Sequence, residues 1–319
     1  MLELLSCVQM SSRLATTLCG IPLKTPVLAA SGTYAYGVEF QHLADLARIG
    51  GIVVKGLSRK PMPGNPPPRL WETEAGMMNS VGLQNIGVRA FVEQKLPSLR
   101  KIDTKIFANV FGYSVPDYVE VIRVLEDAEG IAAYELNVSC PNTKHGGMFF
   151  SNDPGLLGEV VAAVRAVANR PLIVKMSPNV TAIAPLVRVA VESGADAVAL
   201  VNTFVSLAID PKTRTSRVGA GFGGLSGPAI KPIALRLVYE AAQELAADKI
   251  PVIGLGGIAT GLDAAEFLIA GASVVEAGSV NFWDPAAPVR IAEELDQFLA
   301  AEGLGNVSEL VGTIRFPGK

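Results

Sequence analysis

The chain has 319 residues, of which 50% are hydrophobic and 18% charged, so it can build a large core and does not belong to the disordered class. Lysine and arginine number 27 against 30 aspartates and glutamates, and a formal net charge of −3 leaves no basic excess for binding nucleic acid. Three cysteines and two histidines are too few for a disulfide framework or for a structural zinc or iron–sulfur site. The first residues make a poor signal peptide and no apolar stretch is long enough to span a membrane, so we expect a cytoplasmic protein without a membrane anchor.

Eight short runs rich in Val, Ile, Leu and Ala predict strands, in chain order, at 26–32, 50–56, 105–112, 133–140, 171–178, 196–203, 250–258 and 273–279. The runs are continuous rather than alternating, as in parallel strands covered on both faces. Helical patterns separate them, most clearly at 116–125, 154–168, 183–193, 228–247 and 262–270. Eight strand–helix repeats predict one closed (β/α)8 barrel over residues 1–319, with a doubly wound sheet as the alternative.

Two long connections interrupt the repeat, at 57–84 after the second strand and at 204–227 after the sixth. The first contains PMPGNPPPR, which is too rich in proline for a helix and predicts a lid or a short hairpin. Long structured connections in compact domains usually have a function, so we expect both to be lid-like insertions in the barrel.

Polar residues follow the strands at the end where such barrels carry their active sites. Lys55 and Lys175 are embedded in apolar strands, and a buried ammonium group needs a partner, which favours a functional role for both. The turns Gly256–Gly257 and Gly278–Ser279 follow the last two strands, where backbone N–H groups commonly bind phosphate. This pair of turns favours a phosphorylated ligand. Flavin mononucleotide (FMN) would fit, and a phosphorylated sugar is the alternative ligand.

Cys140 stands just past the fourth strand in the segment NVSCPNTKHGG. A lone cysteine is more often a small buried hydrophobe than a reactive group. This one is surrounded by asparagine, lysine and histidine in a loop, where a thiol near cationic groups can act as a base or a nucleophile. Cys7 and Cys19 have no such setting, and we expect them to be structural.

Six segments together resemble the dihydroorotate dehydrogenases: NVSCPNTKHGG, MMNSVGLQNIG, GNPPPR, IVKMSPN, GLSGPAIKP and IPVIGLGGI. They occur in the same order along the chain as in that family, and the resemblance covers nearly the whole chain from about Leu14. Cysteine at the position of the catalytic base, and the absence of N-terminal membrane-binding helices, resemble class 1. Within class 1, SCPNTKHGG and GLQN are most similar to the class 1B catalytic subunit.

The resemblance implies FMN-dependent oxidation of (S)-dihydroorotate to orotate in the de novo synthesis of pyrimidines. Cys140 would remove the C5 proton while hydride passes from C6 to flavin N5. Electrons would reach NAD+ through a partner subunit that carries FAD and a [2Fe–2S] cluster, on a homodimer expanded to a heterotetramer. The alternatives are a dihydropyrimidine dehydrogenase-like FMN module, a class 1A fumarate-dependent enzyme, a non-catalytic FMN barrel and a flavin-free lyase acting on a phosphorylated sugar.

The resemblance also implies the site residues. Those expected to bind the substrate are Lys55, Asn79, Val81, Gly82, Leu83, Asn137, Asn142, Asn202 and Thr203. Those expected to bind FMN are Ala30, Ser31, Lys55, Asn109, Asn137, Lys175, Gly227, Gly256, Gly257, Gly278 and Ser279. Lys175 would stabilise the anionic reduced flavin, and no metal is expected.

Overall fold

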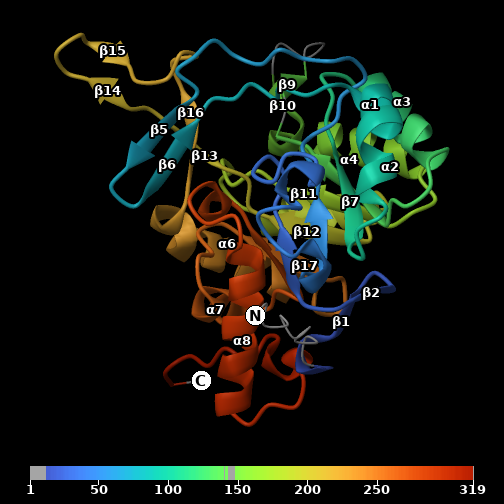
Figure 1. Cartoon of the computed structure of the whole chain (residues 1–319), viewed down its shortest axis with the longest axis vertical. Helices are drawn as coiled ribbons and strands as arrows, with labels where there is room; N and C mark the ends of the chain where they lie inside the picture. The colour runs from blue at the N-terminus through green and yellow to red at the C-terminus, as the bar shows by residue number, and fades with distance from the viewer. Residues whose placement is uncertain (1–11, 140, 143–147, 319) are drawn as a thin grey trace, which may run out of the picture.

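The computed structural model describes residues 12–139, 141–142 and 148–318, and its centre is a closed barrel of eight parallel strands (Figure 1). The strands are β3 (Val27–Ala29), β4 (Gly51–Val53), β7 (Lys105–Val110), β8 (Ala133–Asn137), β11 (Leu172–Lys175), β12 (Ala197–Leu200), β17 (Val252–Leu255) and β18 (Val274–Ala277). They lie side by side in chain order, and β18 closes the barrel against β3. The predicted (β/α)8 barrel is therefore confirmed, and the doubly wound sheet is wrong.

Alternate residues of each strand point into the barrel, because side chains in a strand change face at every residue. Apolar side chains such as Phe107, Ile173 and Val274 belong to one buried cluster in the interior. The residues between them belong to a second cluster, which packs the outside of the barrel against the helices. This two-sided burial explains why the strand runs are continuously apolar.

Six helices cover the barrel: α3 (Val115–Glu126), α4 (Pro154–Arg165), α5 (Ala184–Glu192), α6 (Lys231–Leu245), α7 (Gly261–Ala270) and α8 (Ala287–Ala301). Five of them match the predicted helices to within a few residues at each end, and α8 was not predicted. In α7, Thr260 and Asp263 form a capping box at the start and Gly271 ends the helix in the left-handed conformation. Short helical pieces α1 (Val88–Ala90), η4 (Phe91–Lys95) and α2 (Leu96–Leu99) precede β7, while η2 (Val38–Phe40) and η3 (Leu46–Arg48) follow β3.

The two long connections meet in a four-stranded antiparallel sheet, here called the outer sheet. It lies to the upper left of the barrel strands in Figure 1. Its strands are β5 (Leu70–Thr73) and β6 (Gly76–Asn79) from the first connection, and β13 (Phe204–Ser206) and β16 (Gly223–Ser226) from the second. The pair β5–β6 is the short hairpin expected at 57–84. A small hairpin of β14 (Ile209–Asp210) and β15 (Thr215–Ser216) extends the second connection, and Arg217 after it stacks on Trp71, 4.2 Å from the ring centroid.

Two further hairpins complete the fold. Strands β1 (Thr16–Leu18) and β2 (Ile21–Leu23), which were not predicted, place Leu18 and Leu23 in the interior cluster. Strands β9 (Pro141–Asn142) and β10 (Met148–Phe149) pair after β8. None of the helices in the described part of the chain has the length and apolar character of a membrane span.

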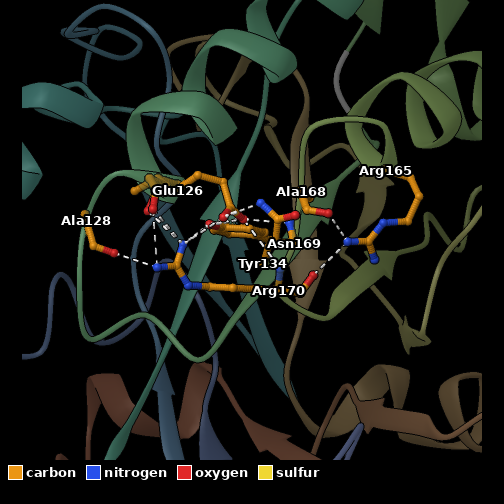
Figure 2. Close-up of polar contacts among 8 residues, drawn as sticks. Glu126, Ala128, Tyr134, Arg165, Ala168, Asn169 and Arg170 are labelled. Carbon is orange, nitrogen blue, oxygen red and sulfur yellow. Dashed lines mark hydrogen bonds and ion pairs between the residues drawn. The ribbon is translucent and has the colours of Figure 1, made fainter.

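Around the amino ends of the strands, a polar network joins the loop after α3 to the loop after α4 (Figure 2). The guanidinium group of Arg170 donates to the carbonyl oxygens of Leu125 at 3.0 Å and Ala128 at 2.7 Å, near the end of α3. The carboxylate of Glu126 accepts from Tyr134 at 2.8 Å and from the backbone of Asn169 at 2.9 Å. Arg170 thus adds a charged donor to the carbonyl of Leu125, which also accepts from the backbone of Ala128 at 3.1 Å, and the network joins α3 to the loop before β11 at the amino ends of the strands.

Candidate active site

A cavity of about 740 Å³ opens at the carboxyl ends of the barrel strands and continues beneath the outer sheet. Its size is in the range of small-molecule and cofactor sites. All predicted site residues other than Cys140 and Asn142 line it: Ala30, Ser31, Lys55, Asn79, Val81, Gly82, Leu83, Asn109, Asn137, Lys175, Asn202, Thr203, Gly227, Gly256, Gly257, Gly278 and Ser279. The structure thus brings residues from all eight barrel strands and both long connections to one cavity.

The structure does not show whether two predicted site residues line this cavity. Cys140 lies outside the described residues. Asn142 belongs to β9, and its side chain also lies outside what the structure describes. The base and one of the four substrate amides therefore remain predictions from the sequence.

A layer of polar side chains lies at the buried end of the cavity, one step along the strands from the apolar interior. Because side chains alternate along a strand, Asn109, Glu135 and Lys175 point to the same side as Phe107, Ala133 and Ile173 two residues earlier. Glu276 follows Val274 in the same way. The barrel interior therefore changes from apolar to charged where the cavity begins.

Lys175 is the centre of this layer. Its Nζ atom lies 3.1 Å from Oε2 of Glu276, 3.3 Å from Oε1 of Glu135 and 3.4 Å from Oγ of Ser31. The amide of Asn109 donates to the same Glu135 oxygen at 2.5 Å. Burial lowers the pKa of Lys175, but the charge of Glu135, then that of Glu276, and the hydrogen bonds to both side chains outweigh burial and raise it, so the ammonium group is charged at neutral pH.

Glu135 and Glu276 were not predicted as site residues. Each is a charged residue inside an apolar strand, which is the same signal that singled out Lys55 and Lys175. Their side chains are 1% exposed, and Glu276 lines the cavity. The alternation along the strands would have placed both beside Lys175, since each stands two residues after an interior position.

Three amide side chains lie in the part of the cavity next to the outer sheet. Asn202 donates from Nδ2 to Oδ1 of Asn137 at 3.1 Å, and its own Oδ1 accepts from the backbone of Thr203 at 2.8 Å. Asn79 donates to the backbone carbonyl of Gly224 in the neighbouring strand at 3.3 Å. An amide offers both a donor and an acceptor, so these side chains can recognise a ring that carries carbonyl and N–H groups beside a carboxylate.

Lys55 supplies a cation to the same cavity. It is half-buried, and burial together with the nearby charge of Arg69 lowers the pKa of its ammonium group, against an opposing contribution from Glu39. It follows Val53, an interior residue of β4, in the alternation of the strand. Lys55 can therefore attract an anionic ligand to the cavity.

The glycine turns after β17 and β18 border the cavity where their strands end. Gly256 and Gly257 have φ angles of 119° and 86°, a left-handed conformation that disfavours residues with a Cβ atom. Asp263 fixes the following loop, because its Oδ2 accepts from the backbone of Ala259 at 2.9 Å and Thr260 at 2.8 Å while Oδ1 pairs with Lys231 at 2.6 Å. These contacts fix the segment that connects the glycine turn to α7.

A second cavity, of about 800 Å³, lies at the amino ends of the strands and includes Cys19 and Asp196. Sγ of Cys19 donates to the carbonyl oxygen of Asp196 at 3.5 Å. Burial, with a contribution from the charge of Asp196, raises the pKa of the Cys19 thiol to about 12, so a thiolate is disfavoured there. The chemistry-bearing groups are at the other end of the barrel.

The family model for dihydroorotate dehydrogenase matches residues 13–299 of the chain. The chain is 70% identical, over 96% of its length and all of the relative's, to a protein of Solibacter usitatus named putative dihydroorotate dehydrogenase A (fumarate). It is 50% identical to a protein of Thermodesulfovibrio yellowstonii and 48% identical to one of Geobacter metallireducens, both named dihydroorotate dehydrogenase B (NAD(+)), catalytic subunit. These matches cover 92% and 95% of the chain and 96% and 98% of the two relatives. With a closed (β/α)8 barrel and a polar cavity at the carboxyl ends of its strands, the chain belongs to the dihydroorotate dehydrogenase family, oxidoreductases of pyrimidine biosynthesis.

Proposed function

We propose that the chain is the catalytic subunit of a class 1B dihydroorotate dehydrogenase, which oxidises (S)-dihydroorotate to orotate with FMN in the cytoplasm. The observation that carries the proposal is the single cavity in which a buried ammonium group, three amides and two glycine turns meet. Family membership supports the reaction, and the arrangement of the cavity supports the assignment of its parts.

The described residues fit FMN in size and in chemistry. The glycine turns leave backbone N–H groups accessible for a phosphate, as the loops after the last two strands of such barrels often do. Lys175, Asn109 and Ser31 present donors at the buried end of the cavity. Held by these residues, FMN would supply the acceptor for the hydride that the substrate loses.

The chain's own residues would bind the substrate and move one proton. Asn79, Asn137 and Asn202 would hold the carboxylate and the ring amides, together with Asn142. Lys55 would balance the charge of the substrate. Cys140 would remove the proton from C5, in the role that a positioned general base takes.

An anaerobic titration tests the reaction. Dihydroorotate added to the purified yellow protein should bleach the flavin absorbance, and dihydrouracil should not. Bleaching by dihydrouracil with none by dihydroorotate would instead support a dihydropyrimidine dehydrogenase-like enzyme. A yellow protein that neither compound bleaches would be a passive flavin binder.

The electron acceptor separates two candidate classes, because one relative is named for fumarate and others are named for NAD+. The class 1B proposal predicts that the isolated chain reduces an artificial dye but scarcely reduces NAD+ or fumarate. Adding a subunit that carries FAD and a [2Fe–2S] cluster should start NAD+ reduction. Fumarate reduction by the chain alone, as fast as dye reduction, would support class 1A.

The proposal includes a homodimer, to which two such partner subunits would add. Leu207 and Ile209, in the second long connection beside the outer sheet, are 50% and 58% exposed and do not line the cavity, and exposed apolar patches are typical of protein contacts. Ile209→Lys should therefore give monomers in sedimentation velocity. Ile233→Lys, the same change at an exposed position of α6, should leave the dimer intact. A wild-type monomer would contradict this assignment.

A further inference from the structure

Three charged side chains from three strands of the barrel meet at the buried end of the cavity. Lys175 of β11 lies within 3.3 Å of both Glu135 of β8 and Glu276 of β18. The three side chains are 5%, 1% and 1% exposed. The other polar groups in contact are neutral, the hydroxyl of Ser31 and the amide of Asn109.

The charges of this cluster do not balance if both carboxyl groups are ionised. Two carboxylates and one ammonium leave a net charge of −1, and an uncompensated buried charge is strongly unfavourable. The cluster also has too few hydrogen-bond donors for its carboxyl oxygens. In the described part of the chain, Oε2 of Glu135 and Oε1 of Glu276 are buried and accept no hydrogen bond. One proton added to the two carboxyl groups supplies both the missing charge and a donor.

The electrostatics of the site favour that proton. Burial, and then the charge of Glu135, raise the pKa of Glu276 well above its usual value of 4.5, against the opposing charge of Lys175. Among the described residues, Glu135 and Lys175 are the charged groups that act on Glu276. Two ionised carboxyl groups bonded to the same buried ammonium group repel each other, which favours the neutral acid at Glu276.

We propose that Glu135 and Glu276 share one proton at neutral pH, held on Glu276, and that this proton makes the Lys175 cluster neutral beside the bound flavin. Glu276 is then a positioning residue that sets the charge around Lys175. Without the proton, a negative charge at the buried end of the cavity would oppose the binding of an anionic cofactor and the addition of electrons to it.

Infrared spectroscopy tests the proton directly. At pH 7 the spectrum of the protein should contain the carbonyl stretching band of a buried carboxylic acid, and Glu276→Gln should remove that band. Glu302→Gln, at an exposed glutamate, is the matched control and should leave the band unchanged. A wild-type spectrum without such a band, with Glu276→Gln indistinguishable from it, would show that both carboxyl groups are ionised and would overturn the proposal.

The pH dependence of FMN binding tests the consequence. The dissociation constant of the wild-type complex should rise at least tenfold as Glu276 loses its proton above neutral pH, because one like charge weakens binding by about that factor even at roughly 12 Å and an effective dielectric constant of about 20. The midpoint potential of bound FMN should fall over the same pH range more steeply than proton uptake by the flavin itself requires. Glu276→Gln carries no proton to lose, so its affinity and potential should match those of the wild type at pH 7. Its affinity should then stay flat, and its potential should follow only the ordinary pH slope of flavin reduction. Wild-type profiles that run parallel to those of Glu276→Gln would overturn the proposal.

A second variant keeps the test decisive if Glu276→Gln does not fold. Glu135→Gln also leaves one carboxyl group beside Lys175, so the cluster of this variant is neutral and has no proton to lose. The variant should therefore lack both the infrared band of the acid and the change in FMN affinity at alkaline pH. Retention of either would count against a shared proton.

The effect on FMN rests on the proposed function, whereas the proton does not. If dihydroorotate bleaches the flavin but the acid band is missing, the shared proton is wrong and the proposed function stands. If the band is present but dihydroorotate does not bleach the flavin, the proposed function is wrong and the shared proton stands.

Discussion

Replacing Lys175 by methionine should destabilise the folded protein far more than the same replacement at a surface lysine. Methionine keeps most of the volume of the side chain and removes only the ammonium group. Glu135 and Glu276 then remain buried with a negative charge that no cation balances, since they hold one proton between them. Breaking a buried ion pair by removing one partner costs about 3–5 kcal/mol of unfolding free energy.

Lys95 is the matched control. Its ammonium group pairs with Glu39 at 2.8 Å, but the two side chains are 31% and 36% exposed. Exposed pairs contribute about 0–1 kcal/mol, so Lys95→Met should change the urea midpoint only slightly. A loss of stability in Lys175→Met no greater than in Lys95→Met would refute the reasoning.

The pH dependence gives a second measure of the Lys175 variant. The raised pKa of Lys175 means that its stabilising contribution is complete at neutral pH and is lost only as the pH rises through that raised pKa. The defect of Lys175→Met comes from a carboxylate, so it should shrink as the pH falls and the carboxyl groups take up protons. Adding Glu135→Gln and Glu276→Gln together to Lys175→Met should recover part of the stability, because the cluster then holds no buried charge. A defect that is independent of pH would point to packing instead of charge.

Two other predictions concern the proposed base and the polar network of Figure 2. Cys140→Ala should still bind FMN and orotate, and its turnover of dihydroorotate should fall by about 10²–10⁴, the usual contribution of a general base; turnover near that of the wild type at neutral pH would remove Cys140 from the mechanism. Arg170→Met should lower the unfolding free energy by about 2 kcal/mol, because helix-end carbonyls lose a charged donor. The FMN affinity of Arg170→Met should stay unchanged, and a loss of affinity would show that the network of Figure 2 reaches the site.

The sequence predicts the barrel well because each strand carries its own signal. A continuous apolar run between two helical patterns depends only on neighbouring residues, and the eight runs correspond to the eight strands. Lys55 and Lys175 could be singled out because a charge inside such a run is rare. Glu135 and Glu276 carry the same signal and were missed, although the two-residue alternation would have placed them on the inner face.

The parts that were not predicted depend on contacts between distant segments. Nothing near Asn79 in the sequence shows that its strand pairs with Gly224, 145 residues away. The hairpin of β1 and β2 has strands of three residues each, too short for a periodic pattern, and is fixed by Leu18 and Leu23 packing into the barrel. Helix α8 is a different case, because its apolar residues have helical spacing and could have been recognised.

The way the outer sheet is assembled has a consequence for the order in which the protein acquires its two ligands as it folds. The part of the cavity proposed to bind FMN is made by barrel strands that pair with their neighbours in the chain, except that β18 pairs with β3, whereas Asn79 is positioned by pairing across 145 residues. Closing a long loop before its contacts form costs chain entropy and slows non-local pairing. A refolding chain should therefore quench FMN fluorescence before it can bind orotate, with a measurable delay between the two signals in stopped-flow mixing. Simultaneous appearance of both signals would mean that barrel and outer sheet fold as one unit. A delay would make cofactor binding the earlier event, with substrate recognition completed on a chain that already holds its flavin.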